Sequence, residues 1–352
     1  MPSRQIEPSL SDRQTTMQRV FSSLCMILLG VPNVVNAAEK PNILYILADD
    51  LGFSDLGCYG SEINTPVLDS LASGGVRLTQ FYNTGRCCPS RAAILTGQYP
   101  HRVGLGHMTT NDLGQPGYRG VVSSEAQTIA QVLTSAGYRS FMSGKWHLGT
   151  PDPTRHGFEE FYGTLVSAKR FFDQAHLLRM PEGRKARQYA DGTFYATDAV
   201  TDHALDFLKI ARKTPDKPWF LYLAYNAPHF PLHAPPEEIA KYKDRYHGGW
   251  DKLRAARLVR MKKLGIVSEH TQLSKRSHWR NYGETKIGLN PAWETLPEDR
   301  RLDLARRMAI YAAMIDRLDQ QIGRVISDLK ATGAYANTLI VFTSDNGACF
   351  EW

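Results

Sequence analysis

Four runs of apolar, β-prone residues are spread along the chain, and polar residues follow each of them at once. The runs cover residues 42–48, 139–143, 219–225 and 338–344. Their apolar positions are consecutive and do not alternate, which is typical of strands buried on both faces of a parallel sheet. The pattern therefore predicts four strands of such a sheet.

Helical patterns separate these runs. Apolar residues recur at helical spacing over 128–136 and 196–212, and over a much longer stretch from about 296 to 332. Thr295 and Glu298 have the spacing of a capping box, and Gly333 is a stop signal. The stripe of the long helix consists of Met308, Tyr311, Ile315, Leu318, Ile322, Val325 and Leu329.

Strands that alternate with helices predict an α/β fold, here a mainly parallel central sheet with helices on both faces. In such folds ligands bind beyond the carboxyl ends of the strands. The polar residues after the four runs should therefore meet at one edge of the sheet.

Two of these polar clusters are rich in carboxylates. Asp49 and Asp50 follow the first run, and Asp345 and Asn346 follow the last. Adjacent carboxylates repel each other in a dry site unless a cation lies between them. The oxygen-rich set suits calcium or magnesium better than zinc. An isolated Asp pair is more often a turn or a helix cap, but two pairs at two strand ends favour a metal site.

The other two clusters carry basic side chains. Lys145 and His147 are two residues apart, so an extended segment points both to one face, where they can hold the oxygens of an anion such as sulfate. His229 lies in a Pro-flanked turn and is a candidate general acid, with His233 as a nearby competitor. His156 is interpreted as structural.

The string Cys87-Cys88-Pro89-Ser90-Arg91 is unusual. Two cysteines can be ordinary buried residues, or half of a disulfide in an exported protein. Pro89 suits the first turn of a helix. The string nevertheless resembles the signature of type I sulfatases, in which the first cysteine is oxidised to formylglycine. Cys87, unlike Cys88, has the one-residue spacer before Pro89 that this signature requires.

The resemblance extends over residues 41–349, to the sulfatases of the alkaline-phosphatase superfamily. It implies that the fold is alkaline-phosphatase-like. The matching pieces occur in the family's order: Pro41-Asn42-Ile43, Asp49 to Gly52, Asn64-Thr65-Pro66, the cysteine motif, Gly144 to Gly149, Ala227-Pro228-His229 and Ser344 to Gly347.

The resemblance also implies roles for individual residues. Calcium, or less readily magnesium, is bound by Asp49, Asp50, Asp345, Asn346 and the modified Cys87. Arg91 steadies the hydrated aldehyde, whereas Lys145, His147, His229 and Ser167 contact the sulfate. One hydroxyl of the hydrate attacks sulfur and the alcohol leaves, after which the second hydroxyl expels sulfate.

The implied partners are a sulfated small molecule or carbohydrate and, during maturation, a formylglycine-generating enzyme. A phosphonate or phosphate ester hydrolase of the same superfamily is the alternative activity, and an inactive fragment is a third interpretation. The formal net charge of +7 suits an anionic substrate, although only weakly. The sequence contains no nucleic-acid module and no 18-residue apolar span for a stable membrane helix.

Residues 1–37 are predicted to be a disordered leader followed by a signal peptide. Arg19 precedes the apolar stretch 24–31, and Val35-Asn36-Ala37 offers small residues for cleavage. We therefore expect an exported protein, periplasmic or secreted; the alternative is an N-terminal helix that packs in the fold. Residues 38–352 would form the catalytic domain, with a basic insertion at about 241–295 that either shapes the substrate cleft or is a solvated excursion.

The chain departs from the family at its end. Family members continue beyond this point with another sulfate-contacting lysine, further strands and a small C-terminal subdomain. We therefore expect a C-terminally truncated catalytic domain with an uncovered sheet edge, low stability and weak activity.

Overall fold

The computed structural model describes residues 40–109, 112–167, 170–276 and 291–348. Residues from Pro41 onward form one compact unit. The predicted leader and signal peptide lie outside the described residues. No helix among the described residues combines the length and apolarity that crossing a bilayer requires.

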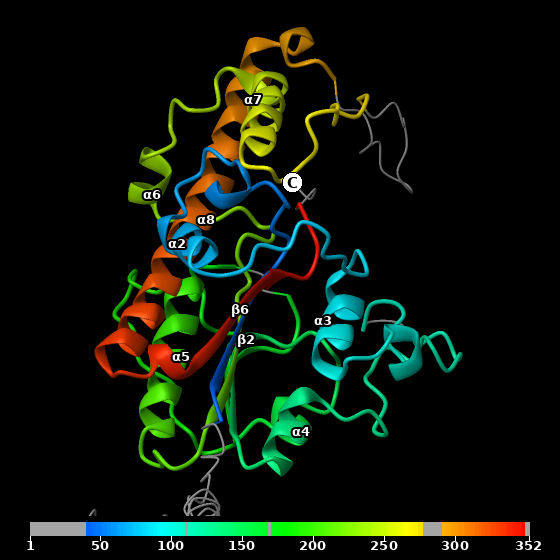
Figure 1. The fold of residues 1–352 in the computed structure, drawn as a ribbon, viewed down its shortest axis with the longest axis vertical. Helices are drawn as coiled ribbons and strands as arrows, with labels where there is room; N and C mark the ends of the chain where they lie inside the picture. The colour runs from blue at the N-terminus through cyan, green and yellow to red at the C-terminus, as the bar shows by residue number, and fades with distance from the viewer. Residues whose placement is uncertain (1–39, 110–111, 168–169, 277–290, 349–352) are drawn as a thin grey trace, which may run out of the picture. The chain divides into compact units, whose positions relative to one another are not determined.

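A six-stranded sheet lies at the centre of this unit, with the strand order β4-β3-β2-β5-β1-β6 (Figure 1). All neighbours are parallel except β3 and β4. The predicted α/β fold is confirmed, and the four predicted strands are present. The strands are β1 (Asn42–Ala48), β2 (Arg139–Lys145), β3 (Glu160–Thr164), β4 (Leu178–Met180), β5 (Trp219–Ala224) and β6 (Thr338–Ser344).

The prediction missed β3 and β4, and both have a physical reason to be inconspicuous. β3 is only five residues long and contains Gly163 and a charged residue, Glu160. It is buried throughout because Glu160 pairs with Arg179 of β4. The antiparallel β4 has three residues, too few for a periodic signal.

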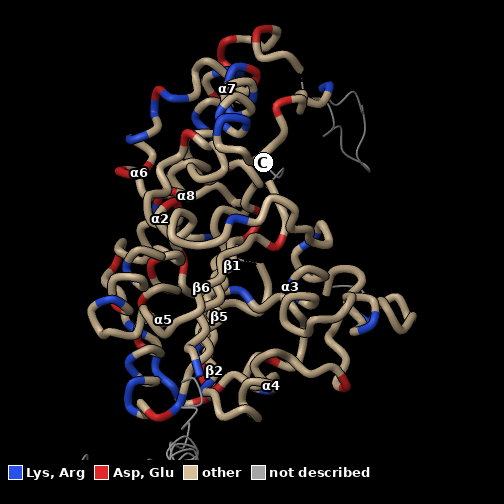
Figure 2. The backbone as a smooth tube through the Cα atoms, in the orientation of Figure 1, with Lys and Arg blue, Asp and Glu red and all other residues tan. Residues whose placement is uncertain are grey.

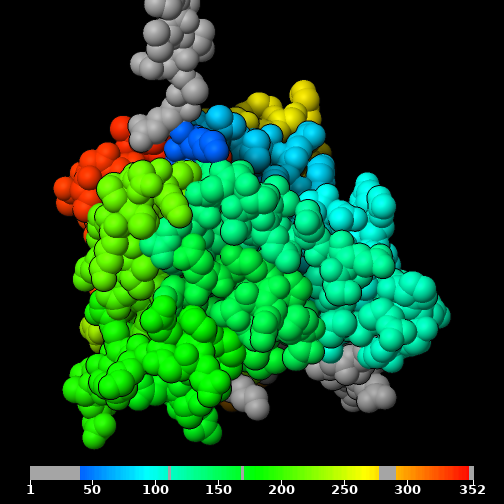
Figure 3. Space-filling model, turned by 90° about the horizontal axis from the view of Figure 1, so that it is seen from below, coloured from blue at the N-terminus to red at the C-terminus, as the bar shows by residue number. Residues whose placement is uncertain are grey.

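Helices cover both faces of the sheet (Figure 1). One face carries α2 (Pro66–Ser73), α5 (Ala196–Ala211) and α8 (Glu298–Ala331), and the other carries α3 (Cys87–Thr96) and α4 (Ile129–Ser135). Each face has its own buried apolar cluster. Figure 3 views the unit from below, where the green segments between α4 and β5 form much of the surface.

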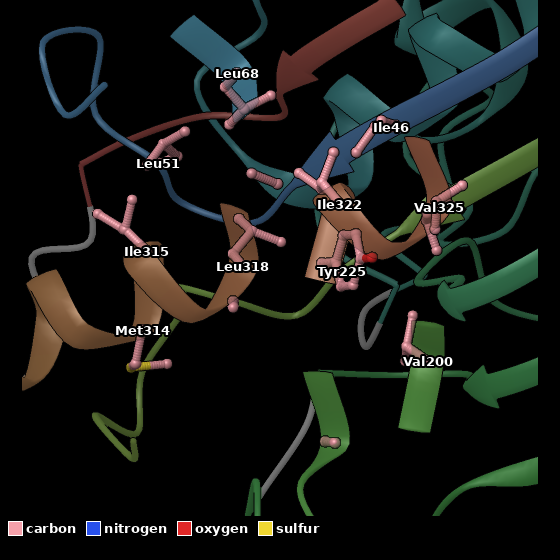
Figure 4. Close-up of a cluster of buried hydrophobic side chains, with 14 of the residues drawn as sticks. Ile46, Leu51, Leu68, Val200, Tyr225, Met314, Ile315, Leu318, Ile322 and Val325 are labelled. Carbon is pink, nitrogen blue, oxygen red and sulfur yellow. The ribbon is translucent and has the colours of Figure 1, made fainter. Parts of the chain in front are cut away.

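The long helix α8 packs its predicted apolar stripe against the sheet and its neighbours. Figure 4 shows this contact and labels Ile46, Leu51, Leu68, Val200, Tyr225, Met314, Ile315, Leu318, Ile322 and Val325. Gly333 follows the helix with a φ of 74°, as its predicted stop role requires.

The predicted capping box of α8 is wrong. The helix begins at Glu298 after Pro297, which makes no side-chain cap. Thr295 belongs instead to the short helix η4 (Trp293–Thr295), and its hydroxyl donates to the carbonyl of Ala292. A capping box does occur at α4, where Thr128 and Gln131 bond to each other's backbone amides.

The predicted basic insertion contains one long helix among its described residues, α7 (Gly249–Lys263). Lys and Arg gather along it in Figure 2. The shorter helices elsewhere are α6 (Pro236–Ala240), η1 (Gly57–Tyr59), η2 (Pro100–Val103), η3 (Pro153–His156) and η5 (Tyr335–Asn337).

Candidate active site

The polar clusters at the carboxyl ends of the parallel strands meet at one place. Ligand atoms of Asp49, Asp50, Cys87 and His229 all lie within 4.8 Å of one another. The backbone fixes this convergence, because the amide of Asp49 donates to Ala227 O at 3.1 Å and that of Asp345 to Ala48 O at 3.2 Å. The predicted edge of the sheet therefore carries the candidate site.

Two cations and two carboxylates form a network beneath this point. Lys145 Nζ lies 2.6 Å from Asp49 Oδ2, and Arg91 Nε lies 2.8 Å from Asp345 Oδ2. Arg91 also approaches Asp49 Oδ1 at 3.4 Å and donates to the carbonyl of Lys145 at 2.6 Å. All four side chains are fully buried. Because desolvating charges is costly, such a network is stable only while its members remain paired.

The two carboxylates of this network are unequal. Burial alone would raise the pKa of Asp49, but Lys145 and Arg91 outweigh it and hold that pKa far below its ordinary value. Burial and the charge of Asp49 raise the pKa of Asp345 to about 7, despite its bond to Arg91. Arg91 therefore does not fully offset the burial of Asp345 and its repulsion by Asp49, an imbalance that a bound cation would correct.

Asp50 adopts a left-handed conformation, with a φ of 63°. Its backbone amide donates to Asp345 Oδ1 at 3.2 Å. Its carboxylate accepts from the side-chain amide of Asn346 and lies 3.5 Å from His229 Nε2. A non-glycine residue in this region of backbone space is strained, and surrounding contacts must hold it there. Both strand-end pairs thus contribute oxygens to one site, beside the turn that follows β1 and contains Asp50, called here the Asp50 turn.

Cys87 is the first residue of α3, and its Sγ lies 4.0 Å from Asp50 Oδ1. Burial, followed by the charge of Asp49, raises the pKa of the Cys87 thiol far above its ordinary value. An unmodified Cys87 would therefore remain a protonated thiol and a poor nucleophile. Cys88 is fully buried in the core cluster with Ala92 and Leu95, and both cysteines are free.

The two candidate histidines differ in their environments. Burial and the neighbouring Lys145 lower the pKa of His147 to about 3, so this ring is neutral, and its Nδ1 has no hydrogen-bond partner among the described residues. His229 Nδ1 donates to the carbonyl of Phe230 at 2.5 Å, which leaves Nε2 directed at the carboxylate of Asp50. His229 Nε2 is therefore the ring atom available for proton transfer at the site.

Two other histidines singled out from the sequence make their contacts elsewhere. His233 accepts from the amide of Phe171 at 3.4 Å and packs on Phe172. His156 is buried against the ring of Trp146, in keeping with a structural role. Ser167 is half-buried three residues after β3, and its sulfate contact stays a prediction.

The residues present fit a hard cation. Asp49 Oδ1 and Asn346 Oδ1 are buried and find no hydrogen-bond partner within the described part of the chain. Buried oxygens without donors are unusual and require an explanation such as an ion. Carboxylate and amide oxygens of this kind are calcium or magnesium ligands.

Known proteins that are similar to this chain point to one family. The profile described as Sulfatase matches residues 41–351. The chain belongs to the sulfatase family. It is 34% identical over 339 residues to an arylsulfatase of Klebsiella aerogenes, which covers 93% of this chain and 70% of the relative. It is 37% identical over 337 residues to the uncharacterized sulfatase PB10D8.02c of Schizosaccharomyces pombe, which covers 88% of this chain.

A solved structure similar to this sulfatase-family chain is Ps i-CgsB in complex with k-i-k-neocarrahexaose. The two share 28% identity and a TM-score of 0.60, over 88% of this chain and 59% of the other. This sulfatase chain spans 58% of the length of the S. pombe relative.

The sequence-based predictions omit two side chains that contact the Asp50 turn. Asp55 accepts from the amide of Gly52 at 3.0 Å, and the hydroxyl of Tyr311 reaches both Asp55 Oδ2 and Asp50 O. Tyr311 belongs to the predicted apolar stripe of the long helix, and its ring packs against the buried cluster there. The hydroxyl group was the available signal, because a buried tyrosine hydroxyl usually needs a hydrogen-bond partner.

Proposed function

We propose that this chain hydrolyses a sulfate ester with a formylglycine derived from Cys87. The observation that carries the proposal is the position of Cys87, at the start of α3 and within 4.8 Å of the ligand atoms of Asp49, Asp50 and His229. As a thiol this residue is deactivated by burial and by Asp49. A conversion that replaces the thiol therefore accounts for a cysteine placed among carboxylates.

Calcium is the proposed metal, and Asp49, Asp50, Asp345 and Asn346 would hold it. When bound, the ion and the hydrated aldehyde together supply charge stabilisation and a nucleophilic oxygen for attack on sulfur. Two buried oxygens that accept no hydrogen bond among the described residues support this ligand set: Asn346 Oδ1, and Asp49 Oδ1 with Arg91 Nη2 3.4 Å away.

The remaining side chains would bind the sulfate and move a proton. Lys145 carries a positive charge and neutral His147 donates or accepts a hydrogen bond, so both can hold sulfate oxygens. Arg91, with three of its nitrogens on Asp49, Asp345 and the Lys145 carbonyl, keeps the network rigid. His229, protonated at Nε2, would give that proton to the leaving alcohol oxygen.

The substrate we propose is a sulfated carbohydrate or a small aryl sulfate. The similarity to an arylsulfatase and to a protein solved with a neocarrahexaose supports this class. We also propose that the chain is exported and is matured by a formylglycine-generating enzyme, on the strength of its N-terminal pattern and its cysteine motif.

Peptide mass spectrometry of Cys87 tests the proposal directly. Conversion of the thiol to an aldehyde removes about 18 Da. The chain should be produced together with a formylglycine-generating enzyme, with Cys87→Ala as the unmodifiable variant and Cys88→Ala as the matched control. Loss of that mass at position 87 and cleavage of an aryl sulfate by the Cys88→Ala variant, but not by Cys87→Ala, are expected. An unmodified thiol, or faster cleavage of an aryl phosphonate than of the sulfate, would overturn it.

A further inference from the structure

The buried carboxylate of Asp55 is held from three sides. The amide of Gly52 donates to its Oδ2 at 3.0 Å, the hydroxyl of Tyr311 donates to the same oxygen at 2.8 Å, and the guanidinium of Arg257 pairs with Oδ1. The approach to the backbone is close, because a Cβ at Gly52 would lie 2.4 Å from Asp55 Oδ2. Asp55 is therefore a junction between the candidate site and two helices.

Tyr311 extends this junction to the site itself. Its hydroxyl lies 3.4 Å from the carbonyl oxygen of Asp50, the left-handed residue of the Asp50 turn. The next amide, of Leu51, donates to Ser344 Oγ at 3.0 Å. Contacts outside the site thus hold the strained backbone of Asp50, because a residue with a positive φ relaxes when its surroundings no longer fix it.

Arg257, on α7, connects the two ends of the segment that follows this turn. Its Nε and Nη2 bind the carboxylate of Glu62 at 2.8 and 2.9 Å, while Nη1 binds Asp55. The hydroxyl of Tyr246 donates to Glu62 at 2.9 Å. The Arg257 side chain is only 15% exposed. A planar guanidinium with several paired nitrogens holds its partners in a defined geometry.

We propose that Arg257 is a positioning residue for the candidate calcium site, and that it acts through Asp55 and Tyr311 on the backbone of Asp50. The inference rests on the proposed function, since it concerns the same cation. The basic segment around α7 would then hold the Asp50 turn in the conformation that presents the Asp50 carboxylate to the cation. Residues that orient metal ligands in this way typically change metal affinity about 10- to 100-fold when they are replaced.

Calcium titration calorimetry on the unmodified chain tests this inference without any turnover. Arg257→Gln should weaken calcium binding roughly 10-fold or more, and Arg257→Lys should restore part of the affinity. Arg254→Gln is the matched control, because Arg254 lies one turn earlier on α7 and contacts Ser274 instead. Tyr311→Phe removes only a hydroxyl, so it provides a conservative second variant; it should weaken binding about as much as Arg257→Gln, and the two losses should not add.

Hydrogen exchange of the amides of residues 50–55 in calcium-free protein gives a second measurement. Exchange there should accelerate in Arg257→Gln and Tyr311→Phe but not in Arg254→Gln. Calcium affinity within two-fold of the parent in both folded variants would overturn the inference. If the parent chain itself binds no calcium, the proposed function fails instead, and unchanged exchange in the variants would then reject the positioning role as well.

Discussion

In the described part of the chain, two clusters of arginine and carboxylate groups differ in how completely they are paired. The cluster around Arg91 is fully buried and the cluster around Arg257 is mostly buried. Around Arg257, every carboxylate oxygen of Asp55 and Glu62 has a hydrogen-bond donor. Around Arg91, by contrast, Asp49 Oδ1 is buried without a hydrogen bond. We call the fully paired cluster around Arg257 closed and the incompletely paired cluster around Arg91 open. A closed cluster stabilises the structure, whereas an open one retains affinity for a ligand. The residue types in the two clusters do not by themselves reveal this difference in pairing.

The largest difference should appear when one cation is removed from the open cluster. Lys145→Met should reduce sulfate ester hydrolysis by roughly 10²- to 10³-fold, because a group that stabilises charge on the transferring sulfate is lost. It should also cost about 3 kcal/mol of stability, since Asp49 remains buried beside one cation fewer. Steady-state kinetics and urea unfolding measure the two effects.

The matched control is Lys209→Met. Lys209 is 63% exposed and lies 3.8 Å from Asp206, so its removal should change stability by less than about 0.5 kcal/mol and leave hydrolysis intact. Equal effects of the two lysine substitutions would mean that the open cluster has no special role.

Removal of calcium should produce the next largest effect. A ligand present at 100 times its dissociation constant stabilises the folded state by about 2.7 kcal/mol. Chelation should therefore lower the melting temperature of the parent chain in calorimetry, but have little effect on Asp345→Asn, in which the ligand set is already weakened. A melting temperature insensitive to calcium in the parent would contradict the proposed ion.

Within the closed cluster, Glu62 should matter for stability and not for chemistry. Glu62→Gln removes the charge that faces Arg257, and we expect a loss of about 2 kcal/mol in urea unfolding. Hydrolysis per folded molecule should stay within a few-fold of the parent, because Asp55 still holds the guanidinium. Glu294→Gln, at a residue that is 68% exposed, should change neither quantity. A Glu62→Gln variant that is fully stable but inactive would reverse the assignment of the two clusters.

Two buried histidines extend the comparison to the smallest effect. His203 has both ring nitrogens satisfied, by Ala199 O and the amide of Arg187, whereas His147 Nδ1 lacks a partner within the described residues. Burial lowers the pKa of His203 to about 4. Below about pH 6.5 the unfolded chain therefore binds a proton that the folded chain does not take up until about pH 4.

Stability should accordingly fall as the pH drops through this window, by up to about 1.4 kcal/mol per pH unit from His203. His203→Gln should remove that contribution when urea unfolding at pH 7 and pH 5 is compared, with hydrolysis unchanged at pH 7. His247→Gln, at an imidazole that is 49% exposed, serves as the control and should keep the parent slope. An unchanged slope in His203→Gln would show that this ring does not titrate on unfolding.

Much of the fold could be predicted from local pattern, and the failures have physical causes. The predicted bounds of β1 and β6 match the structure, because each is a largely apolar run that polar residues end at once. β3 was missed because the burial of Glu160 depends on Arg179, a partner 19 residues away. The capping box at Thr295 failed because the helix begins only at Glu298, with Pro297 as its N-cap.

The candidate site divides in the same way. The sequence supplied the residue types, and the parallel order of β2, β5, β1 and β6 brought their carboxyl ends together as expected. The sequence could not reveal the left-handed backbone of Asp50 and His147, because conformation at a single residue is set by the contacts around it. Nor did it indicate that Tyr311, within an apolar stripe, turns its hydroxyl toward Asp50.

By itself, then, the sequence determined the α/β class, the family and the set of chemical groups at the strand ends, because periodicity and short motifs are local properties of the chain. Only the tertiary structure decided which charged groups are fully paired and which are left open. It also decided that Arg257 of α7, about 200 residues away in the chain, pairs with Asp55. Pairing and burial arise from residues distant in the chain, and no local pattern records them.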